Sequence, residues 1–172
     1  GRWSFGVAST TASMLHWKAW SHLLDCEQML EVMELILPTW SMCVASGGDF
    51  VEGSANSSYQ KLHSDFGGDD LGPFNVAFPP PYVSANFVVQ PVTQNNGPMR
   101  ILPGTHVQAV SAMVCEQIFE HRHEPKQYLE STLQPLRKGD VIIRDVRVLH
   151  GGTPNHTDST RFLPAVEFAS RY

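Results

Sequence analysis

The chain has 172 residues, of which 42% are hydrophobic and 17% charged, and its formal net charge is −5 at neutral pH. These values fit one globular domain with a core of its own and exclude a disordered chain. The densest basic group is the pair Arg137-Lys138, so the chain lacks the basic surface that nucleic acids or anionic membranes require, and we expect neither as a partner.

Cysteine content and hydropathy bear on the compartment. The three cysteines, Cys26, Cys43 and Cys115, are odd in number and far apart, which argues against a disulfide framework or a cysteine zinc site. The longest apolar stretches are too short to cross a membrane, and no signal peptide is recognisable. We therefore expect an intracellular protein, cytoplasmic or in an organelle, that is neither secreted nor inserted in a membrane. The chain begins at Gly1, so a processed chain and a piece of a longer one both fit, and the oligomeric state is left open.

The first predicted element is a helix over Met14–Leu37. Apolar residues recur there at spacings of three, four and seven or eight, with acidic residues between them, and Pro38 marks the end. Such a segment is typical of an amphipathic helix packed on a sheet.

From Trp40 onward the pattern becomes mainly that of strands, and twelve prolines and thirteen glycines indicate frequent turns. A short helix is expected over Ala109–His121, and the segment Leu133–His150 reads as two strands around the turn at Lys138–Asp140. The other predicted strands are residues 40–47, 84–92, 99–104 and 161–170.

The long irregular segment Phe66–Tyr82 is unusual for a compact domain, where such loops are often functional. One interpretation is a lid whose aromatic side chains close over a substrate. The alternative is a surface loop whose aromatic side chains are buried in the core. Asp69 and Asp70 make it acidic, which favours a small, largely apolar substrate over a coenzyme A thioester.

His63 and Asp65 stand two residues apart in "YQKLHSDFGG". If Leu62–Phe66 is extended, both side chains point to the same face, where they could hold a metal or share a proton. Because a His-x-Asp pair is common by chance, the assignment needs a third group.

His150 and Arg161 supply that group in "VLHGGTPNHTDSTRFLP". A hairpin centred on Asn155 and His156 would set His150 opposite Arg161, with Cβ atoms roughly 4.5–5.5 Å apart on one face. Two histidines and one carboxylate form the facial triad of non-heme Fe(II) oxygenases. An arginine beside them could hold the far carboxylate of a dicarboxylate cosubstrate such as 2-oxoglutarate.

Other polar residues receive no metal role. His121 and His123 have the same spacing as the candidate pair, but at the end of a helix their side chains diverge by about 200°. Arg144 falls on the same side as His150 by strict alternation, and the sequence offers no reason for it.

Four segments together resemble the phytanoyl-CoA dioxygenase family of Fe(II)/2-oxoglutarate-dependent oxygenases, from about Gln60 to Phe168. They are "QKLHSD", "NNGPMRILPGTH", "GDVIIRDVRVLHGG" and "HGGTPNHTDSTR". Each motif is weak alone, but their order, with His150 87 positions after His63 and Arg161 eleven after His150, is specific.

The resemblance implies a mainly β fold, a double-stranded β-helix or jelly-roll with flanking helices. It implies one domain over residues 1–172, with a helical part at 1–39 and a β-helix core at 40–172, shortened at its N-terminus relative to the family. The implied activity is oxidation, such as hydroxylation, of a small organic substrate by O₂, coupled to conversion of 2-oxoglutarate to succinate and CO₂.

By position, the resemblance makes His63, Asp65 and His150 the catalytic iron ligands. It makes Arg161 the partner of the 2-oxoglutarate carboxylate, and Gln60 and Thr153 further cosubstrate contacts. Fe(II) and 2-oxoglutarate are thus the expected cofactor and cosubstrate.

Two other interpretations stay open. A non-catalytic jelly-roll subunit of a larger assembly could retain the metal site, although loss of the triad would be its expected mark. A cupin-like metalloenzyme that uses no 2-oxo acid is disfavoured by Arg161. The presence of Asp65 favours oxygenation over halogenation, which dispenses with the carboxylate ligand.

Overall fold

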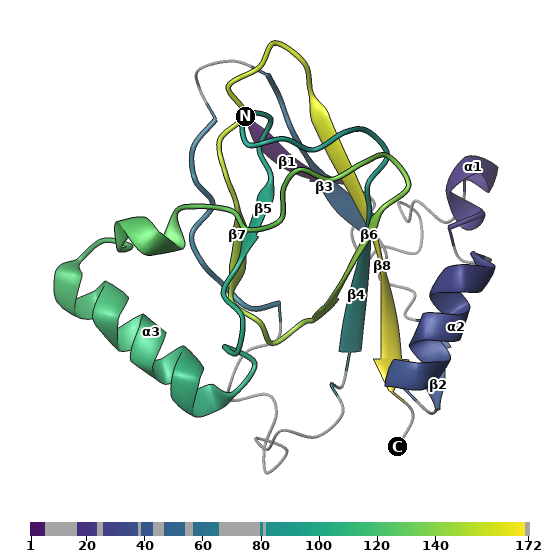
Figure 1. The fold of residues 1–172 in the computed structure, drawn as a ribbon, viewed down its shortest axis with the longest axis horizontal. Helices are drawn as coiled ribbons and strands as arrows, with labels where there is room; N and C mark the ends of the chain where they lie inside the picture. The colour runs from purple at the N-terminus through teal and green to yellow at the C-terminus, as the bar shows by residue number, and fades with distance from the viewer. Residues whose placement is uncertain are drawn as a thin grey trace.

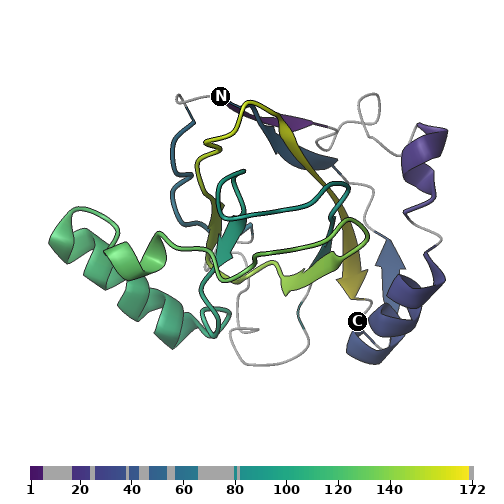
Figure 2. The same ribbon diagram turned by 45° about the horizontal axis from the view of Figure 1, so that its top comes forward.

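The computed structural model describes residues 1–5, 17–23, 26–37, 39–42, 47–53, 57–65, 80 and 82–170. Within these ranges two antiparallel sheets face each other, with two short helices on the outer side of the larger sheet and a longer helix beside the smaller one (Figures 1 and 2). This architecture confirms the mainly β, jelly-roll fold expected from the sequence.

The larger sheet is centred on the long strand β8. Its strand order is β1-β3-β8-β4-β6, and β2 also pairs with β8. The bounds of these strands are β1 Arg2–Phe5, β2 Trp40–Met42, β3 Gly47–Val51, β4 Tyr82–Phe87, β6 Val141–Asp145 and β8 Arg161–Ser170. The part at residues 1–39, which was expected to be helical, therefore also contributes a strand, β1, to the larger sheet.

The smaller sheet pairs β5, Met99–Ile101, with β7, His150–Gly152. The other edge of β7 carries an isolated antiparallel bridge between His63 and His150. The segment around His63 is therefore extended beside β7, as the candidate metal pair required.

The predicted hairpin between His150 and Arg161 is wrong. β7 lies in the smaller sheet, where His150 pairs with Ile101, and β8 lies in the larger sheet, where Arg161 pairs with Val51. The chain between them crosses from one sheet to the other. Asn155 holds this crossing, because its Nδ2 donates to the carbonyl oxygens of Val51 and Ser159.

β4 shows how alternation divides the two faces of the larger sheet. Val83 and Ala85 are buried on the outer face, and Ser84 and Asn86 point to the inner face, which lines a cavity. The outer face forms the main core with α2, Glu27–Ile36. The buried members of this core are Met29, Met33, Leu37, Val83, Ala85, Phe87, Val166 and Phe168.

The predicted helix over Met14–Leu37 is two helices in the described residues, α1 at Lys18–Ser21 and α2. Cys26 is extended and caps α2, so the helix does not run continuously. Trp20, Leu23 and Cys26 are partly buried and pack against the core.

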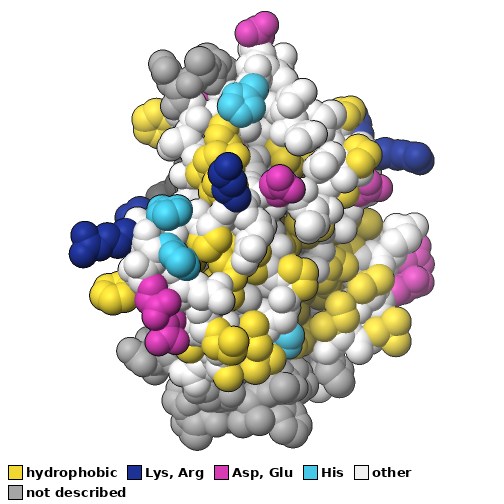
Figure 3. Space-filling model, turned by 60° about the vertical axis from the view of Figure 1, so that its left-hand side comes forward, with side chains coloured by type: hydrophobic (Ala, Val, Ile, Leu, Met, Phe, Trp, Pro, Cys, Tyr) yellow, Lys and Arg dark blue, Asp and Glu magenta, His cyan; other side chains and the backbone are white. Residues whose placement is uncertain are grey.

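α3, Gln108–His121, confirms the second predicted helix. Only Val114 is buried in it, whereas Met113 and Phe119 are 61% and 84% exposed. Figure 3 brings this side of the molecule forward and shows hydrophobic side chains between scattered charged ones. A 3-10 helix at Lys126–Tyr128 follows.

The remaining differences concern strand limits. β3 begins at Gly47, where a turn was expected, and β4 begins and ends earlier than the predicted strand. The predicted strand before Lys138 is reduced to a single bridge between Leu136 and Val92. The turn itself is confirmed by Gly139, whose φ of 100° suits glycine.

Cys26 and Cys115 are free thiols, and Cys43 lies outside the described residues. None of the helices that the structure describes is long and apolar enough to cross a membrane.

Candidate metal centre

His63 and His150 are direct neighbours across two antiparallel chain segments. Each backbone N–H donates to the other residue's carbonyl oxygen, at 3.0 and 2.9 Å. A directly opposed pair presents its side chains on one face, and the two imidazole rings lie 4.4 Å apart between centroids. The backbone pairing therefore brings together two histidines separated by 87 positions.

Asp65 completes the cluster from the same extended segment. Its backbone N–H donates to the carbonyl of Val146 at 3.0 Å. Its Oδ1 then lies 3.6 Å from Nε2 of His63 and 3.5 Å from Nε2 of His150. Ligand atoms held roughly 2.1 Å from one metal and about 90° apart would be separated by roughly 3 Å, close to these distances.

Each histidine ring is oriented by a hydrogen bond at Nδ1, while Nε2 is the nitrogen that faces Asp65. Nδ1 of His63 lies 2.9 Å from the carbonyl of Lys61, and Nδ1 of His150 lies 3.0 Å from that of Val148. A carbonyl only accepts, so Nδ1 carries the proton and Nε2 presents its lone pair to the cluster. This arrangement is typical of metal-binding histidines.

Arg144 holds the oxygen of Asp65 that faces away from the histidines. Its Nη2 donates to Oδ2 of Asp65 at 2.5 Å, and its Nε donates to Asn86 at 3.3 Å. The arginine is 8% exposed. The sequence left Arg144 without a role, and the structure places it as the partner of the candidate carboxylate ligand.

The charges in the cluster favour the form that binds a cation. Burial alone would raise the pKa of Asp65, but the positive charge and hydrogen bond of Arg144, with the histidines, lower it. Burial, with Arg144, lowers the pKa of His150 to about 4. At neutral pH Asp65 is therefore ionised and the His150 imidazole is neutral, the states in which both can be ligands.

Within the described residues, His63, Asp65 and His150 are the one group of three or more candidate ligand side chains whose atoms converge, all within 4.8 Å of one another. Two imidazole nitrogens and one carboxylate suit a divalent iron ion and leave open positions for other ligands. The residues present thus fit the Fe(II) that the sequence predicted.

The cluster opens on a cavity of about 390 Å³ between the two sheets. Besides the three candidate ligands, the inner face of the larger sheet lines it with side chains from β3, β4, β6 and β8. Polar groups are frequent on that face, among them Asp49, Ser84, Asn86, Arg144, Arg161 and Glu167.

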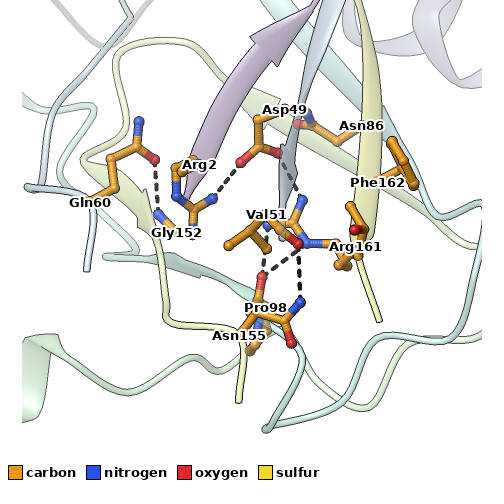
Figure 4. Close-up of polar contacts among 12 residues, drawn as sticks. Arg2, Asp49, Val51, Gln60, Asn86, Pro98, Gly152, Asn155, Arg161 and Phe162 are labelled. Atoms are coloured by element: carbon orange, nitrogen blue, oxygen red, sulfur yellow. Dashed lines mark hydrogen bonds and ion pairs between the residues drawn. The ribbon is translucent and has the colours of Figure 1, made fainter. Parts of the chain in front are cut away.

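Arg161 lies in this cavity and is 1% exposed (Figure 4). Its Nη1 donates to Asp49 at 2.8 Å, and its Nε and Nη2 donate to the carbonyl of Gly97 at 3.1 and 2.8 Å. Arg2 donates to the other oxygen of Asp49 and to the carbonyl of Thr153. Three of the five N–H groups of Arg161 are thus committed, which leaves two for a ligand.

The two further predicted cosubstrate contacts lie in different places. Gln60 lines the cavity, and its Oε1 accepts from the backbone N–H of Gly152 at 3.0 Å (Figure 4). Thr153 does not line it; its hydroxyl donates to Pro98 at 2.8 Å, and it borders a separate hollow. The structure therefore brings Gln60, but not Thr153, to the candidate centre.

Arg100 fixes the segment that carries His63. It is fully buried and donates to the carbonyl oxygens of Gln60 and Tyr128, and it pairs with Glu124 at 2.6 Å. Glu124 also accepts from the backbone N–H of Leu62 at 2.9 Å. The segment that follows α3 is thereby linked to the ligand segment, a relationship that no local motif predicted.

The remaining predictions from the sequence concern His121, His123 and the lid at residues 66–82. His121 and His123 have ring centroids 6.2 Å apart, and Nδ1 of His123 binds the carbonyl of His121. They do not belong to the converging group. The predicted lid at residues 66–82 lies outside the described residues except for Pro80 and Tyr82.

Sequence reasoning missed Asp49 and Glu167. Each is an acidic residue within a strand whose neighbours are mostly apolar or small, and that contrast was the signal available. Only the register of the sheet shows that both face the cavity of the candidate metal ligands.

Comparison with known proteins supports these features. The model of the family described as phytanoyl-CoA dioxygenase matches residues 18–163. Dioxygenase FrzG of Cladobotryum sp is 31% identical over 155 residues, which are 87% of this chain and 49% of FrzG. Dioxygenase lolE1 of Epichloe uncinata is 31% identical over 84 residues, which are 49% of this chain and 32% of lolE1. The chain thus spans about half or less of the length of these curated relatives.

Solved structures share the fold at low identity. AviO1 from Streptomyces viridochromogenes has a TM-score of 0.68 at 20% identity, covering 98% of this chain and 66% of AviO1. EctD from S. alaskensis, solved with 2-oxoglutarate and 5-hydroxyectoine, has a TM-score of 0.62 at 16% identity, covering 96% of this chain and 60% of EctD. The epimerase SnoN, described as non-heme and α-ketoglutarate-dependent, has a TM-score of 0.64 at 18% identity, covering 91% of this chain and 59% of SnoN.

Proposed function

The chain belongs to the phytanoyl-CoA dioxygenase family, and from this premise we propose that it is an Fe(II)- and 2-oxoglutarate-dependent dioxygenase that oxidises a small organic substrate. The observation that carries the proposal is the convergence of two histidine Nε2 atoms and one Asp65 oxygen within 4.8 Å. When bound, iron supplies O₂ activation coupled to oxidative decarboxylation of 2-oxoglutarate to succinate and CO₂.

In this proposal, the residues of the chain set the geometry of the metal site. His63, Asp65 and His150 are the metal ligands. Arg144 keeps Asp65 ionised and occupies its Oδ2, so that Oδ1 alone is directed to the metal position. The remaining positions on the metal are then free for the cosubstrate and O₂.

Arg161 is the proposed partner of the far carboxylate of 2-oxoglutarate. Two of its N–H groups are uncommitted, and the bonds to Gly97 and Asp49 fix the plane of its guanidinium in the cavity. A planar guanidinium held in this way is suited to a carboxylate. Gln60, which also lines the cavity, is a proposed secondary contact.

The size of the cavity limits the reaction to small molecules. About 390 Å³ must hold the cosubstrate and the reacting part of the substrate together. Its opening between the two sheets lets both reach the metal position.

The proposal is tested on anaerobically purified protein. Calorimetry with Co(II), which resists oxidation, should show one bound metal per chain, and Fe(II) with 2-oxoglutarate in air should yield succinate. His63→Ala, Asp65→Ala and His150→Ala should each lose metal binding and succinate formation. His121→Ala and His123→Ala are matched controls and should behave like the parent.

Two results would count against the proposal. If the three alanine variants bind metal like the parent, the ligands lie elsewhere. If metal and 2-oxoglutarate bind but no succinate forms, even slowly without substrate, the chain is better described as the non-catalytic jelly-roll subunit that keeps its metal site.

A further inference from the structure

Three polar side chains form a row across the inner face of the larger sheet. Ser84 on β4 is directly opposite Arg144 on β6 and directly opposite Glu167 on β8. Directly opposed residues share a face, and all three line the cavity that also holds the candidate metal ligands. We name Arg144, Ser84 and Glu167 the polar row.

The row has hydrogen-bonding capacity that the described residues do not use. Nη1 of Arg144 and Oγ of Ser84 are buried and have no partner among them. The carboxylate of Glu167, which is half-buried, has no hydrogen bond or ion pair with any residue that the structure describes. Buried polar groups are rarely left in this state unless a ligand or water completes them.

Arg144 and Glu167 differ in how far a neighbouring group compensates their charge. Arg144 is already paired with Asp65 at 2.5 Å, so its charge is largely satisfied. Burial, followed by the negative charge of Asp65, raises the pKa of Glu167, and Arg144 only partly opposes this. A carboxylate in this position gains most from a cationic group that enters with the substrate and excludes water.

The row lies away from the proposed cosubstrate position. Arg161 and Glu167 are on the same face of β8, six residues apart, which is roughly 20 Å along a strand. Arg144 links the row to the metal position because the same guanidinium holds Asp65. The cosubstrate carboxylate and a second ligand can therefore occupy opposite ends of the inner face.

We propose that the polar row is the substrate-recognition subsite, in which Glu167 binds a protonated amine and Ser84 with Nη1 of Arg144 contacts a neighbouring oxygen of the same small molecule. The proposal rests on the dioxygenase function above and names its substrate class as a small amine bearing an adjacent hydroxyl or carbonyl. The polar face does not favour the largely apolar substrate that the sequence suggested.

The test compares cyclopentylamine with cyclopentanol, which match in size and differ in charge at neutral pH. Binding of each is measured by calorimetry to the anaerobic protein with Fe(II) and 2-oxoglutarate, and again without 2-oxoglutarate. The amine should bind at least about tenfold more tightly than the alcohol. Equal binding of the two probes would overturn the proposal.

Variants locate the preference. Glu167→Gln keeps the shape without the charge and should reduce the preference for the amine to within about twofold, and Glu167→Met gives a second, uncharged replacement. Glu167→Asp should retain the preference, and so should Glu116→Gln, which removes an exposed carboxylate on α3. A preference that survives in both uncharged variants would place the amine elsewhere and overturn the assignment of Glu167.

A third probe addresses the rest of the row. trans-2-Aminocyclopentanol should bind more tightly than cyclopentylamine, and Ser84→Ala should abolish that gain. Absence of the gain in the parent would remove Ser84 and Arg144 from the subsite. Metal and 2-oxoglutarate affinities are measured in parallel in the parent and in every variant. If the parent binds neither metal nor 2-oxoglutarate, the dioxygenase function is contradicted. If the parent binds both but does not prefer the amine, only the subsite is contradicted.

Discussion

The guanidinium of Arg144 holds one carboxylate oxygen of Asp65 at 2.5 Å, and the other oxygen lies 3.5 Å from Nε2 of His150. The two residues are 79 positions apart, on β6 and on the segment beside β7. The carboxylate of Asp65 thus accepts a hydrogen bond from the buried guanidinium through one oxygen and faces the proposed metal position with the other. Arg144 therefore sets both the charge and the orientation of the candidate ligand.

Replacing Arg144 by Gln should weaken metal binding by about 10- to 100-fold, the usual effect of removing a group that orients a ligand. Calorimetry with Co(II) measures this directly. Arg147→Gln is the matched control, because Arg147 is also 8% exposed and paired with a carboxylate, that of Asp145, but does not line the cavity. Equal loss of metal affinity in both variants would mean that Arg144 acts only through stability.

Replacing Arg161 by Leu should weaken 2-oxoglutarate binding by at least about tenfold, since a buried carboxylate would lose its partner at a cost of about 2–5 kcal/mol. Metal affinity should stay unchanged, because Arg161 contacts none of the three candidate ligands in the structure. Calorimetric titration of the metal-loaded protein gives both values. Unchanged cosubstrate affinity would favour an enzyme that uses no 2-oxo acid.

Asp49→Asn should tighten 2-oxoglutarate binding. Asp49 accepts from both Arg2 and Arg161, so it neutralises the cations that an incoming carboxylate would meet. The asparagine keeps the shape of the side chain and removes the competing charge. Weaker binding in this variant, measured by the same titration, would show that Asp49 orients Arg161 more than it competes for it.

The metal-free protein should lose stability as the pH falls below neutral. His150 has a pKa near 6.5 when unfolded and about 4 when folded, because it is buried beside Arg144. The unfolded state therefore takes up its proton first, and the contribution of His150, on the order of 3 kcal/mol, is present above pH 6.5 and lost between about pH 6.5 and 4.

Urea unfolding with a chelator at several pH values measures this loss. His150→Gln should flatten the slope between pH 6.5 and 4, and His121→Gln, at an exposed histidine on α3, should not. The lowered pKa of Asp65 causes a further loss of stability, which begins as the pH falls through the pKa of an unfolded aspartate, about 3.9. An unchanged slope in His150→Gln would contradict the burial argument.

Met33→Ala should destabilise the fold by about 2–5 kcal/mol without changing metal affinity, because Met33 is fully buried in the core on the outer face of the larger sheet. Leu35→Ala, at a position 84% exposed on the same helix, should change stability by no more than about 0.5 kcal/mol. Urea unfolding and metal titration check both. A loss of metal affinity in Met33→Ala would show that α2 supports the centre through the sheet.

The sequence by itself determined the members of the candidate centre. The His63–Asp65 spacing requires only that the chain be extended, since side chains two apart then share a face. The order of four motifs supplied His150 and Arg161. The strand of residues 161–170 and the helix near residues 109–121 also follow from local patterns, and both are present in the structure.

Tertiary structure alone decided how those residues meet. Equal distance from a turn suggested that His150 faces Arg161, but the two belong to different sheets, and His150 is instead paired with His63. Local spacing carries no information about which sheet a strand joins, because that depends on burial of each face against distant segments. The same holds for Arg144, Asp49 and Glu167: alternation gives each a face, and only the register between strands shows that those faces line one cavity with the candidate metal ligands.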